Sequence, residues 1–447
     1  MPKRPPNLLI FAIDSIRRDH MSCYGYPRLT TPHMDRLAAR GTVFENAFSA
    51  YIPTTPAYVT MLTGRDIVAN QQVALTPLGP MADDQPTLPE LLKPAGYRSV
   101  MVGHGEWYRG FDKHLQYEGW GGPWAERPSR KAENLNAVVL PELERLHQAN
   151  KPWLLYLRHM DPHSPYYPPP PYDSLFYSKD PCSRKLPNTM NAVRAFKPFA
   201  DYLLSWLPPG IRDAEFVIAQ YDGALAYMDA CIQRLVTRTE ELGVADNTLI
   251  IITGDHGETL YDHECWFDHH GLYEPTLVVP LVFYWPGVIE AGVRSKAVTL
   301  QEDFVPTLLD ITGQKRLARG VKFDGVSLKR YVKDTGGSPR SEFYITECTW
   351  MRKHGWRTPI WKFWESLEPD FHGKPPVELY NLVEDPQELR NLADQEPEIV
   401  AALRSRMNAW IRKRCRATGK RNPIELHEIG LDRRIGSIET AQKLQKR

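Results

Sequence analysis

The sequence predicts an α/β fold in which a mostly parallel sheet is sandwiched by helices. Two observations support this prediction. Short and almost wholly apolar runs recur along the chain, and helical patterns lie between them. Such runs are typical of parallel strands buried on both faces, and their alternation with helices is typical of α/β domains. With 447 residues, the chain is long enough for one large domain and a smaller one.

The strands of the large domain are expected at the apolar runs. A helical pattern over Asp213–Leu242 places apolar residues on one face and supplies one of the covering helices. The expected strands are, in chain order, Asn7–Ile13, Arg98–Val102, Trp153–Leu157, Thr248–Thr253 and Val278–Tyr284.

The composition changes after about Gly336, where short strand-like runs precede an amphipathic pattern over Pro397–Arg412. We therefore expect a smaller α+β domain behind the large one. The polar tail that follows has two interpretations: an arm that exchanges between subunits of a homo-oligomer, or a disordered segment. The expected division is residues 1–335 for the large α/β domain, 336–416 for the small domain and 417–447 for the tail.

Charge and hydropathy exclude two classes of partner. The formal net charge is +1, so no overall field recruits nucleic acid or an anionic membrane. No apolar run approaches the roughly 18 residues of a membrane span. We expect a soluble protein with a small-molecule substrate.

Cysteine usage and the N-terminus predict a cytoplasmic location. The six cysteines are scattered without CxxC pairs, which favours reduced thiols. Only MPKRPP precedes the first apolar run, and that run is too short for a secretory signal.

Acidic and imidazole side chains follow three of the expected strands. The first strand runs into Asp14, the third is followed by Asp161 and His163, and the fourth by Asp255 and His256. Ligands bind at the carboxyl ends of strands in open α/β sheets, because the loops converge there. The pattern predicts a metal site. Carboxylates with imidazoles suit Zn²⁺ or Mn²⁺, while Mg²⁺ or Ca²⁺ would accept the carboxylates alone.

The stretch YIPTTPAYVTMLTGR places two hydroxyl groups, on Thr54 and Thr55, at the expected start of a helix. Taken alone, the stretch indicates helix capping. Beside the predicted metal it has a second interpretation. A metal that contacts the Thr54 hydroxyl would lower its pKa, and the helix N-terminus would favour an anionic reacting centre. We therefore predict that Thr54 is a nucleophile and also lies in the metal coordination sphere.

Several segments, taken in order, resemble one known family. They are NLLIFAIDSIRRDHMSCYGY, PTTPAYVTMLTGR, LRHMDPHSPY, TLIIITGDHGE, DHHGLYEPTLVVPLVFYWPG and ELYNLVEDPQELRNLA. Together they resemble the sulfatase branch of the alkaline phosphatase superfamily, nearly end to end. The resemblance implies that family's fold and metal-dependent ester cleavage, with Asp14 as a metal ligand and Thr54 at the nucleophile position.

The nucleophile segment departs from the sulfatase pattern. Sulfatases typically carry a Cys or Ser that is converted to formylglycine, in C/S-x-P-S-R. Here the same register begins at Thr54 and ends at Tyr58, so both the convertible residue and the supporting Arg are absent. A formylglycine diol releases sulfate by collapsing to the aldehyde, which a sulfated threonine cannot do. Threonine serves instead in phosphodiesterases and phosphonate monoester hydrolases of this branch, so the sequence favours phosphorus over sulfur.

Further departures concern residues around the expected pocket. Sulfatases usually show Gly-Lys-x-His where this chain has His104 and Glu106, which by this register are expected to contact substrate. A family Lys is replaced by His269, followed by His270. One of these two imidazoles is expected to face the site, and spacing alone does not decide which. With Asp161 and His163, they make a second metal conceivable.

The sequence thus predicts a metal-dependent hydrolase of phosphate diesters or phosphonate monoesters that works through a phospho-threonine. One or two divalent ions are expected, on Asp14, Asp255 and His256 and, for a second ion, on Asp161, His163 and His270. His163, His269 or His270 would assist the leaving group or hold a second metal. The alternatives are a sulfate-ester hydrolase without formylglycine, a phosphoryl transferase and a non-catalytic metal- or ligand-binding relative.

Overall fold

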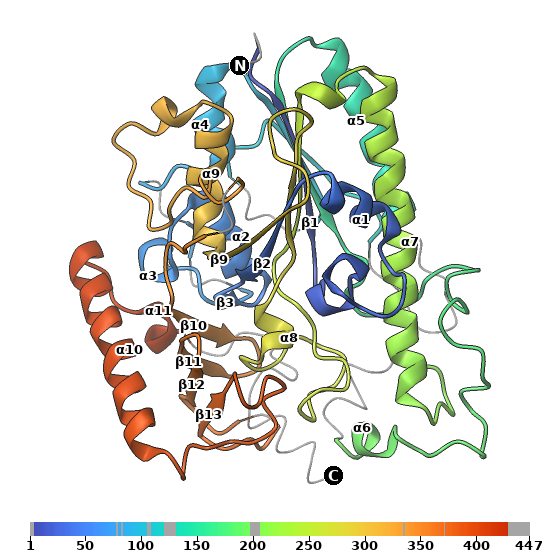
Figure 1. The fold of residues 1–447 in the computed structure, drawn as a ribbon, viewed down its shortest axis with the longest axis vertical. Coiled ribbons are helices and arrows are strands. Elements are labelled where there is room, and N and C mark those ends of the chain that lie inside the picture. The colour runs from blue at the N-terminus through green and yellow to red at the C-terminus, as the bar shows by residue number, and fades with distance from the viewer. Residues whose placement is uncertain are drawn as a thin grey trace.

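The computed structural model describes residues 4–76, 79–81, 84–104, 109–119, 131–196, 206–333, 336–370 and 372–427. Its centre is an eight-stranded sheet in the order β5-β4-β6-β1-β7-β8-β2-β9 (Figure 1). The strands are β1 (Asn7–Ile13), β2 (Thr42–Phe48), β4 (Arg98–Val102), β5 (Lys113–Leu115), β6 (Trp153–His159), β7 (Thr248–Gly254), β8 (Leu281–Tyr284) and β9 (Val293–Leu300). All neighbouring pairs are parallel except those of β8, which runs antiparallel to β7 and β2.

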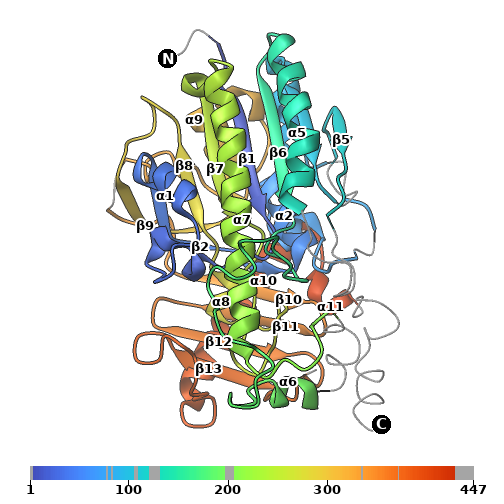
Figure 2. The same cartoon turned by 90° about the vertical axis from the view of Figure 1, so that its right-hand side faces the viewer.

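Helices cover both faces of this sheet, so the predicted fold class is confirmed. Helices α1, α5 and α7 pack on one face, where Figure 2 shows α5 and α7 side by side, and α2, α4 and α9 pack on the other. Leu9 and Phe11 of β1 point to the first layer, and Leu8 and Ile10 point to the second. These helices are α1 (Pro32–Ala39), α2 (Thr54–Thr63), α4 (Leu88–Leu92), α5 (Lys131–Gln148), α7 (Ala214–Glu241) and α9 (Phe304–Ile311).

The expected strands all form, with small differences in length. Strand β6 continues to His159, two residues beyond the expected end. Strand β8 begins at Leu281 and not at Val278. Pro280 precedes it and has no N–H to donate to a sheet. Val278 forms only an isolated bridge with Phe48.

The proline-rich segment after β6 packs along α7. Gly223 of α7 makes this close approach possible, because a Cβ at that position would lie 2.3 Å from the Tyr172 carbonyl oxygen. The start of the segment is buried at Tyr166 and Tyr167. The segment is therefore packed against α7.

A second, five-stranded sheet has the order β13-β12-β11-β10-β3. Its edge strand, β3 (Tyr51–Ile52), comes from the N-terminal region and directly precedes α2. The small sheet thus holds the segment that leads into α2. Its other strands are β10 (Phe343–Cys348), β11 (Arg352–Arg357), β12 (Trp361–Ser366) and β13 (Val377–Asn381), and the remaining helices are α3 (Ile67–Asn70), α6 (Asn191–Ala195), α8 (Glu274–Leu277), α10 (Pro397–Thr418) and α11 (Pro423–Leu426).

Helix α10 flanks the small sheet in Figure 1 and extends beyond the expected domain end at residue 416. After it, α11 buries Ile424 against the same core. The first residues of the expected tail therefore belong to the small domain, and residues 428–447 lie outside the described residues. The oligomerisation arm stays a prediction.

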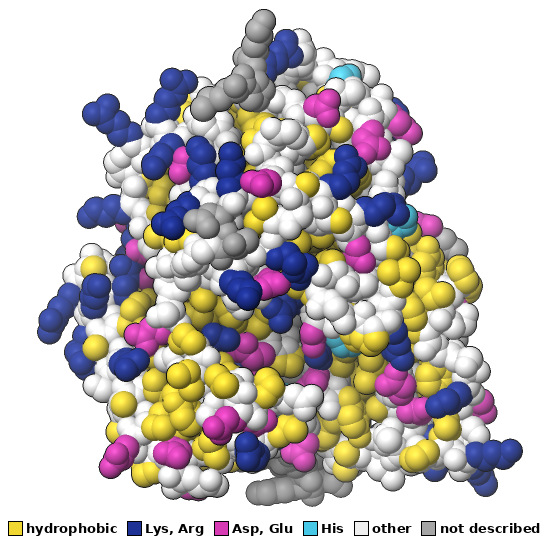
Figure 3. Space-filling model, in the orientation of Figure 1, with side chains coloured by type: hydrophobic (Ala, Val, Ile, Leu, Met, Phe, Trp, Pro, Cys, Tyr) yellow, Lys and Arg dark blue, Asp and Glu magenta, His cyan; other side chains and the backbone are white. Residues whose placement is uncertain are grey.

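Charges of both signs are interspersed over the face shown in Figure 3. All six cysteines are free. Among the described helices, none is both long and apolar enough to cross a membrane.

Candidate active site

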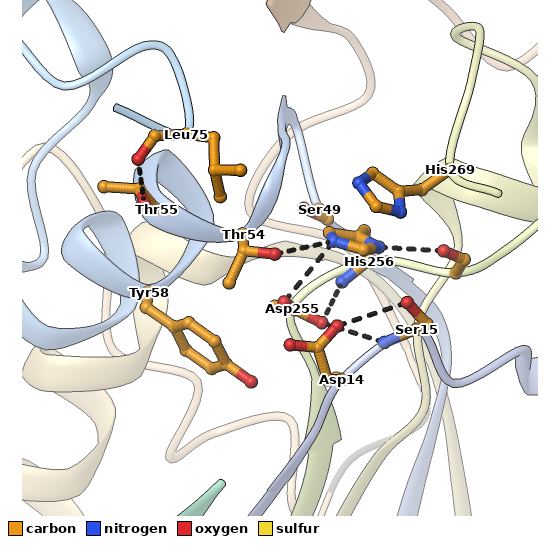
Figure 4. Close-up of polar contacts among 12 residues, drawn as sticks. Asp14, Ser15, Ser49, Thr54, Thr55, Tyr58, Leu75, Asp255, His256 and His269 are labelled. Carbon is orange, nitrogen blue, oxygen red and sulfur yellow. Dashed lines mark hydrogen bonds and ion pairs between the residues drawn. The ribbon is translucent and has the colours of Figure 1, made fainter. Parts of the chain in front are cut away.

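Strands β1 and β7 pair in parallel and end side by side, with Ile13 opposite Gly254. The residues that follow them, Asp14, Asp255 and His256, are fully buried. One oxygen or nitrogen atom from each lies within 4.8 Å of the others. The structure therefore brings together the three metal ligands expected from the sequence (Figure 4).

Backbone and hydroxyl groups orient the two carboxylates. The Ser15 N–H donates to Asp255 Oδ1 at 3.2 Å, and the Ser15 hydroxyl donates to Asp14 Oδ1 at 3.2 Å. The His256 N–H donates to the same Asp255 oxygen at 2.9 Å. Ser15 has φ +59°, a left-handed conformation that is uncommon for a residue with a side chain and is typical of functional sites. Ser15 thus bridges the two acids and caps no helix.

The Thr54 hydroxyl points into this group, 3.1 Å from His256 Nε2. His256 Nδ1 lies 2.8 Å from the Gly257 carbonyl oxygen. Because a carbonyl oxygen only accepts, Nδ1 carries the ring proton and Nε2 presents its lone pair to Thr54.

The two hydroxyl groups of the threonine pair have different partners. Helix α2 begins at Thr54, but no side chain caps its N-terminus. The Thr55 hydroxyl turns away and donates to the Leu75 carbonyl oxygen at 2.7 Å (Figure 4). Thr54 alone of the pair therefore reaches the predicted metal ligands.

The two buried acids have opposite pKa shifts. Burial alone would raise the pKa of Asp14, but the neighbouring Arg158 lowers it below its usual range. Burial, and then the charge of Asp14, raise the pKa of Asp255 well above its usual value. Burial also lowers the pKa of His256 to about 3, which keeps this imidazole neutral. A neutral imidazole is the form that ligates metals.

These residues fit a divalent cation. Asp255 Oδ2 is buried and has no hydrogen-bond partner among the described residues. A cation among these donors would compensate this oxygen and hold Asp255 ionised. Carboxylates with an imidazole suit a borderline ion such as Zn²⁺ or Mn²⁺.

Arg158 is a site residue that the sequence analysis missed. Its Nε donates to Asp14 Oδ2 at 3.0 Å, and its Nη2 donates to the same oxygen. Its Nη1 donates to the His104 carbonyl oxygen at 2.6 Å, and its guanidinium lies over the Tyr58 ring at 5.3 Å. Tyr58 stands in the register of the Arg that this chain lacks. The available signal was an arginine within the otherwise apolar run WLLYLR.

Asp161 lies apart from the donor group, contrary to its expected role as a second-metal ligand. It is buried, and its nearest charged partner is Lys131, with Nζ 3.9 Å from Oδ1. Burial raises its pKa to about 6, and Lys131 offsets only part of this shift. Lys131 donates to the carbonyl oxygens of Met160 and His163 at 3.0 and 2.7 Å, and so holds this loop.

His163 lies beside His269. Its Nδ1 lies 2.7 Å from the Ser164 carbonyl oxygen. Its ring centroid is 5.9 Å from that of His269. Its charge would lower the pKa of Asp14, so it lies within electrostatic range of the predicted metal ligands.

The structure distinguishes the two adjacent imidazoles. The His269 ring stacks on His256, with 4.4 Å between centroids, and faces the site (Figure 4). Its Nδ1 lies 2.9 Å from Asp268 Oδ1. Burial lowers its pKa, but Asp268 overrides this effect and raises it to about 10. His270 turns toward Asp268 Oδ2, at 3.2 Å, and toward the His372 ring. His270 therefore supports Asp268 and does not join the Asp14 group.

The expected substrate contacts are only partly described. The His104 ring lies 5.1 Å from that of Tyr117, and its backbone carbonyl holds Arg158. Burial, and then Arg158, lower the pKa of His104. Glu106 lies outside the described residues.

Comparisons with known proteins place the chain among relatives. A family model described as Sulfatase matches residues 6–314. A second, described as N-sulphoglucosamine sulphohydrolase, C-terminal, matches residues 262–413. The chain is 23% identical to N-acetylglucosamine-6-O-sulfatase of Bacteroides thetaiotaomicron, over 87% of this chain and 82% of that protein. It is 26% identical to human arylsulfatase A, over 90% of this chain and 87% of that protein.

Solved structures show the same fold. A putative sulfatase from Bacteroides thetaiotaomicron superposes with a TM-score of 0.75 at 20% identity, covering 97% of both chains. The phosphonate monoester hydrolase of Agrobacterium radiobacter superposes with a TM-score of 0.72 at 21% identity, covering 92% of this chain and 96% of that one. The Sulfatase model spans more than half of the sequence and includes Asp14, Thr54, Asp255 and His256. The chain therefore belongs to the sulfatase family.

Proposed function

We propose that the chain is a metal-dependent ester hydrolase in which Thr54 is the nucleophile and the substrates are phosphate diesters or phosphonate monoesters. The observation that carries the proposal is the 3.1 Å contact of the Thr54 hydroxyl with His256, at a buried group of metal-ligating side chains. The curated relatives are named as sulfatases, which supports ester hydrolysis as the general reaction.

The residues of the site divide the work of the reaction. Asp14, Asp255 and His256 would hold a divalent ion, which would lower the pKa of the Thr54 hydroxyl and offset charge on the ester oxygens. Thr54 Oγ loses its proton to solvent and forms a bond to phosphorus as the bond from phosphorus to the leaving ester oxygen breaks in line. Water then attacks phosphorus, the bond between Thr54 Oγ and phosphorus breaks, and Oγ takes a proton from that water.

The leaving oxygen needs a proton, and two imidazoles beside the site are the candidates to supply it. His163 and His269 face each other with 5.9 Å between ring centroids. Burial lowers the pKa of His163, whereas Asp268 overrides burial and raises that of His269. Either ring could protonate the leaving group from this side of the site.

Threonine at position 54 favours phosphorus over sulfur on chemical grounds. A sulfated threonine has no aldehyde to collapse to, so water must break the sulfate ester. A phospho-threonine is opened by attack of water on phosphorus. Sulfate esters are the second candidate substrates, because the relatives are named as sulfatases.

The test is the rate of the full chain, loaded with Mn²⁺ or Zn²⁺, on bis(4-nitrophenyl) phosphate and on 4-nitrophenyl sulfate. We expect faster hydrolysis of the diester. We also expect a phosphoryl adduct on the peptide that contains Thr54, detected by mass spectrometry after acid quench. Faster hydrolysis of the sulfate, with a sulfated peptide, would establish the second candidate.

Thr54→Ala provides the mutational test. It should lower diester turnover by about 10³-fold or more, because it removes the attacking oxygen. Thr55→Ala is the matched control, since its hydroxyl contacts only the Leu75 carbonyl among the contacts described. If Thr54→Ala kept the turnover of the control, the nucleophile assignment would be wrong. Loss of turnover with unchanged ligand binding would exclude the non-catalytic alternative.

Cytoplasmic location, formation of homo-oligomers and the identity of the ion also remain predictions. Fractionation of the native host, light scattering of the purified chain and metal analysis would test them in turn.

A further inference from the structure

The loop that follows β7 brings a second group of ligand atoms together. Single atoms of Glu258, Asp268 and His269 lie within 4.8 Å of one another. We propose that these three side chains hold a second divalent cation, next to the one expected at Asp14, Asp255 and His256. The inference rests on the proposed function in one respect: the second ion would act on the same anionic ester.

Glu258 is the strongest evidence for this ion. Its side chain is fully buried, and the hydrogen-bond donor that acts on its carboxylate is the neutral Tyr166 hydroxyl. His269 Nδ1 lies 3.9 Å from Oε1, which is too far for a hydrogen bond. A buried carboxylate with one neutral donor is costly, because that donor does not replace the hydration that burial removes. A cation would satisfy both oxygens.

Tyr166 is the polar neighbour of Glu258. Its hydroxyl is buried and acts on the Glu258 carboxylate as a hydrogen-bond donor. Burial, and then the charge of Glu258, raise the pKa of this hydroxyl, which places it next to the carboxylate. A hydroxyl oxygen in this position would suit a hard or borderline cation as an additional ligand.

Asp268 has the outer support that is typical of a metal ligand. Its Oδ2 lies 3.2 Å from His270 Nε2, and its Oδ1 accepts from the His269 backbone N–H at 2.7 Å. Ligating carboxylates are usually fixed by hydrogen bonds of this kind. This arrangement also accounts for His270, which the Asp14 group does not use.

The two groups adjoin, because the His269 ring stacks on His256 at 4.4 Å. The two groups together contain four carboxylates, those of Asp14, Asp255, Glu258 and Asp268. The guanidinium of Arg158 adds one positive charge. Lys131 and Asp161 pair with each other and add no net charge. With the four carboxylates ionised and His269 protonated, one divalent ion leaves these groups without net charge. A second divalent ion beside a neutral His269 makes them positive, which favours an anionic ester.

The second ion assigns separate roles to the two facing imidazoles. His269 would be a neutral ligand through Nδ1, the atom that faces Asp268 and Glu258. His163 would then be the imidazole left to protonate the leaving group. The competing arrangement has no second ion: a protonated His269 pairs with Asp268, and Glu258 is protonated.

The experiment is a metal count on the full chain, saturated with Mn²⁺, passed through a desalting column and measured by mass spectrometry with plasma ionisation. We expect two equivalents for the wild type and one for Glu258→Gln. Asp262→Asn is the matched control: Asp262 lies in the same loop but pairs with Arg17, and its variant should keep two equivalents. One equivalent for the wild type, or two for Glu258→Gln, would overturn the proposal.

Anomalous diffraction of wild-type crystals soaked in Mn²⁺ makes the result independent of how the variants fold. We expect one peak among Asp14, Asp255 and His256 and another among Glu258, Asp268 and His269. A peak at the first position alone would exclude the second ion. Because neither measurement uses a substrate, a failed diesterase assay and a failed metal count would be told apart.

Discussion

Asp14 and Asp161 hold similar places in the fold and have different surroundings. The first follows β1 and the second follows the neighbouring strand β6, and both side chains are buried at the same edge of the sheet. Arg158 contacts Asp14 through two nitrogens, and the pKa of Asp14 falls below its usual range despite burial. Asp161 has Lys131 at 3.9 Å, and burial raises its pKa to about 6.

The two cations, Lys131 and Arg158, differ in how their hydrogen bonds are distributed. Lys131 donates to the backbone carbonyls of Met160, His163 and Pro165, so its charge is shared before it reaches Asp161. Arg158 directs two of its nitrogens at one carboxylate oxygen, the strong form of a charge-assisted contact. The end of a strand brings each of these two acids to the edge of the sheet, and the contacts of its cationic neighbour set the direction of its pKa shift.

The largest expected effect separates the two acids directly. Asp14→Asn should lower diester turnover by about 10³-fold, because it removes a charged ligand of the predicted ion. Asp161→Asn should change turnover by less than about tenfold, since Asp161 lies outside both donor groups. Steady-state rates at saturating Mn²⁺ would measure both. Similar losses for the two variants would mean that Asp161 shares the work of Asp14.

The next effect is on stability, and its sign follows from the raised pKa of Asp161. Between about pH 4 and pH 6 the native state holds a proton on Asp161 that the unfolded state has released. The free energy of unfolding should therefore fall as pH rises through this window, by about 3 kcal/mol from this group. Asp161→Asn removes the titration. Urea unfolding of both proteins at pH 4 and pH 7 would measure the difference, and parallel pH dependences would contradict the assignment.

The smallest expected effect is that of Arg158. Arg158→Met leaves Asp14 buried without its guanidinium, so the pKa of Asp14 should rise and metal binding should need a higher pH. Mn²⁺ affinity near pH 6 should fall by about 10- to 100-fold. Arg158→Lys should restore only part of it, because an ammonium group cannot donate through two fixed nitrogens. Unchanged affinity in Arg158→Met would show that Asp14 needs no cationic partner.

The main features of the fold and of the predicted metal site follow from local patterns. Apolar runs such as Asn7–Ile13 became strands buried on both faces, because a parallel sheet covered by helices on both sides leaves no exposed face. Asp14, Asp255 and His256 converge because parallel strands end at one edge. Thr54 reaches them because it starts the helix that faces that edge.

Residue types at short spacing were enough to predict the fold class, the positions of five strands and the group formed by Asp14, Asp255 and His256. Three features could be seen only in the tertiary structure. They are the choice between His269 and His270, the contact of Arg158 with Asp14, and the grouping of Glu258 with Asp268. Each depends on side-chain directions within loops or between strands, and sequence spacing does not carry that information. Asp161 shows the limit most clearly. The sequence predicts that Asp161 follows a strand. It does not predict that Lys131, thirty residues earlier in α5, faces Asp161.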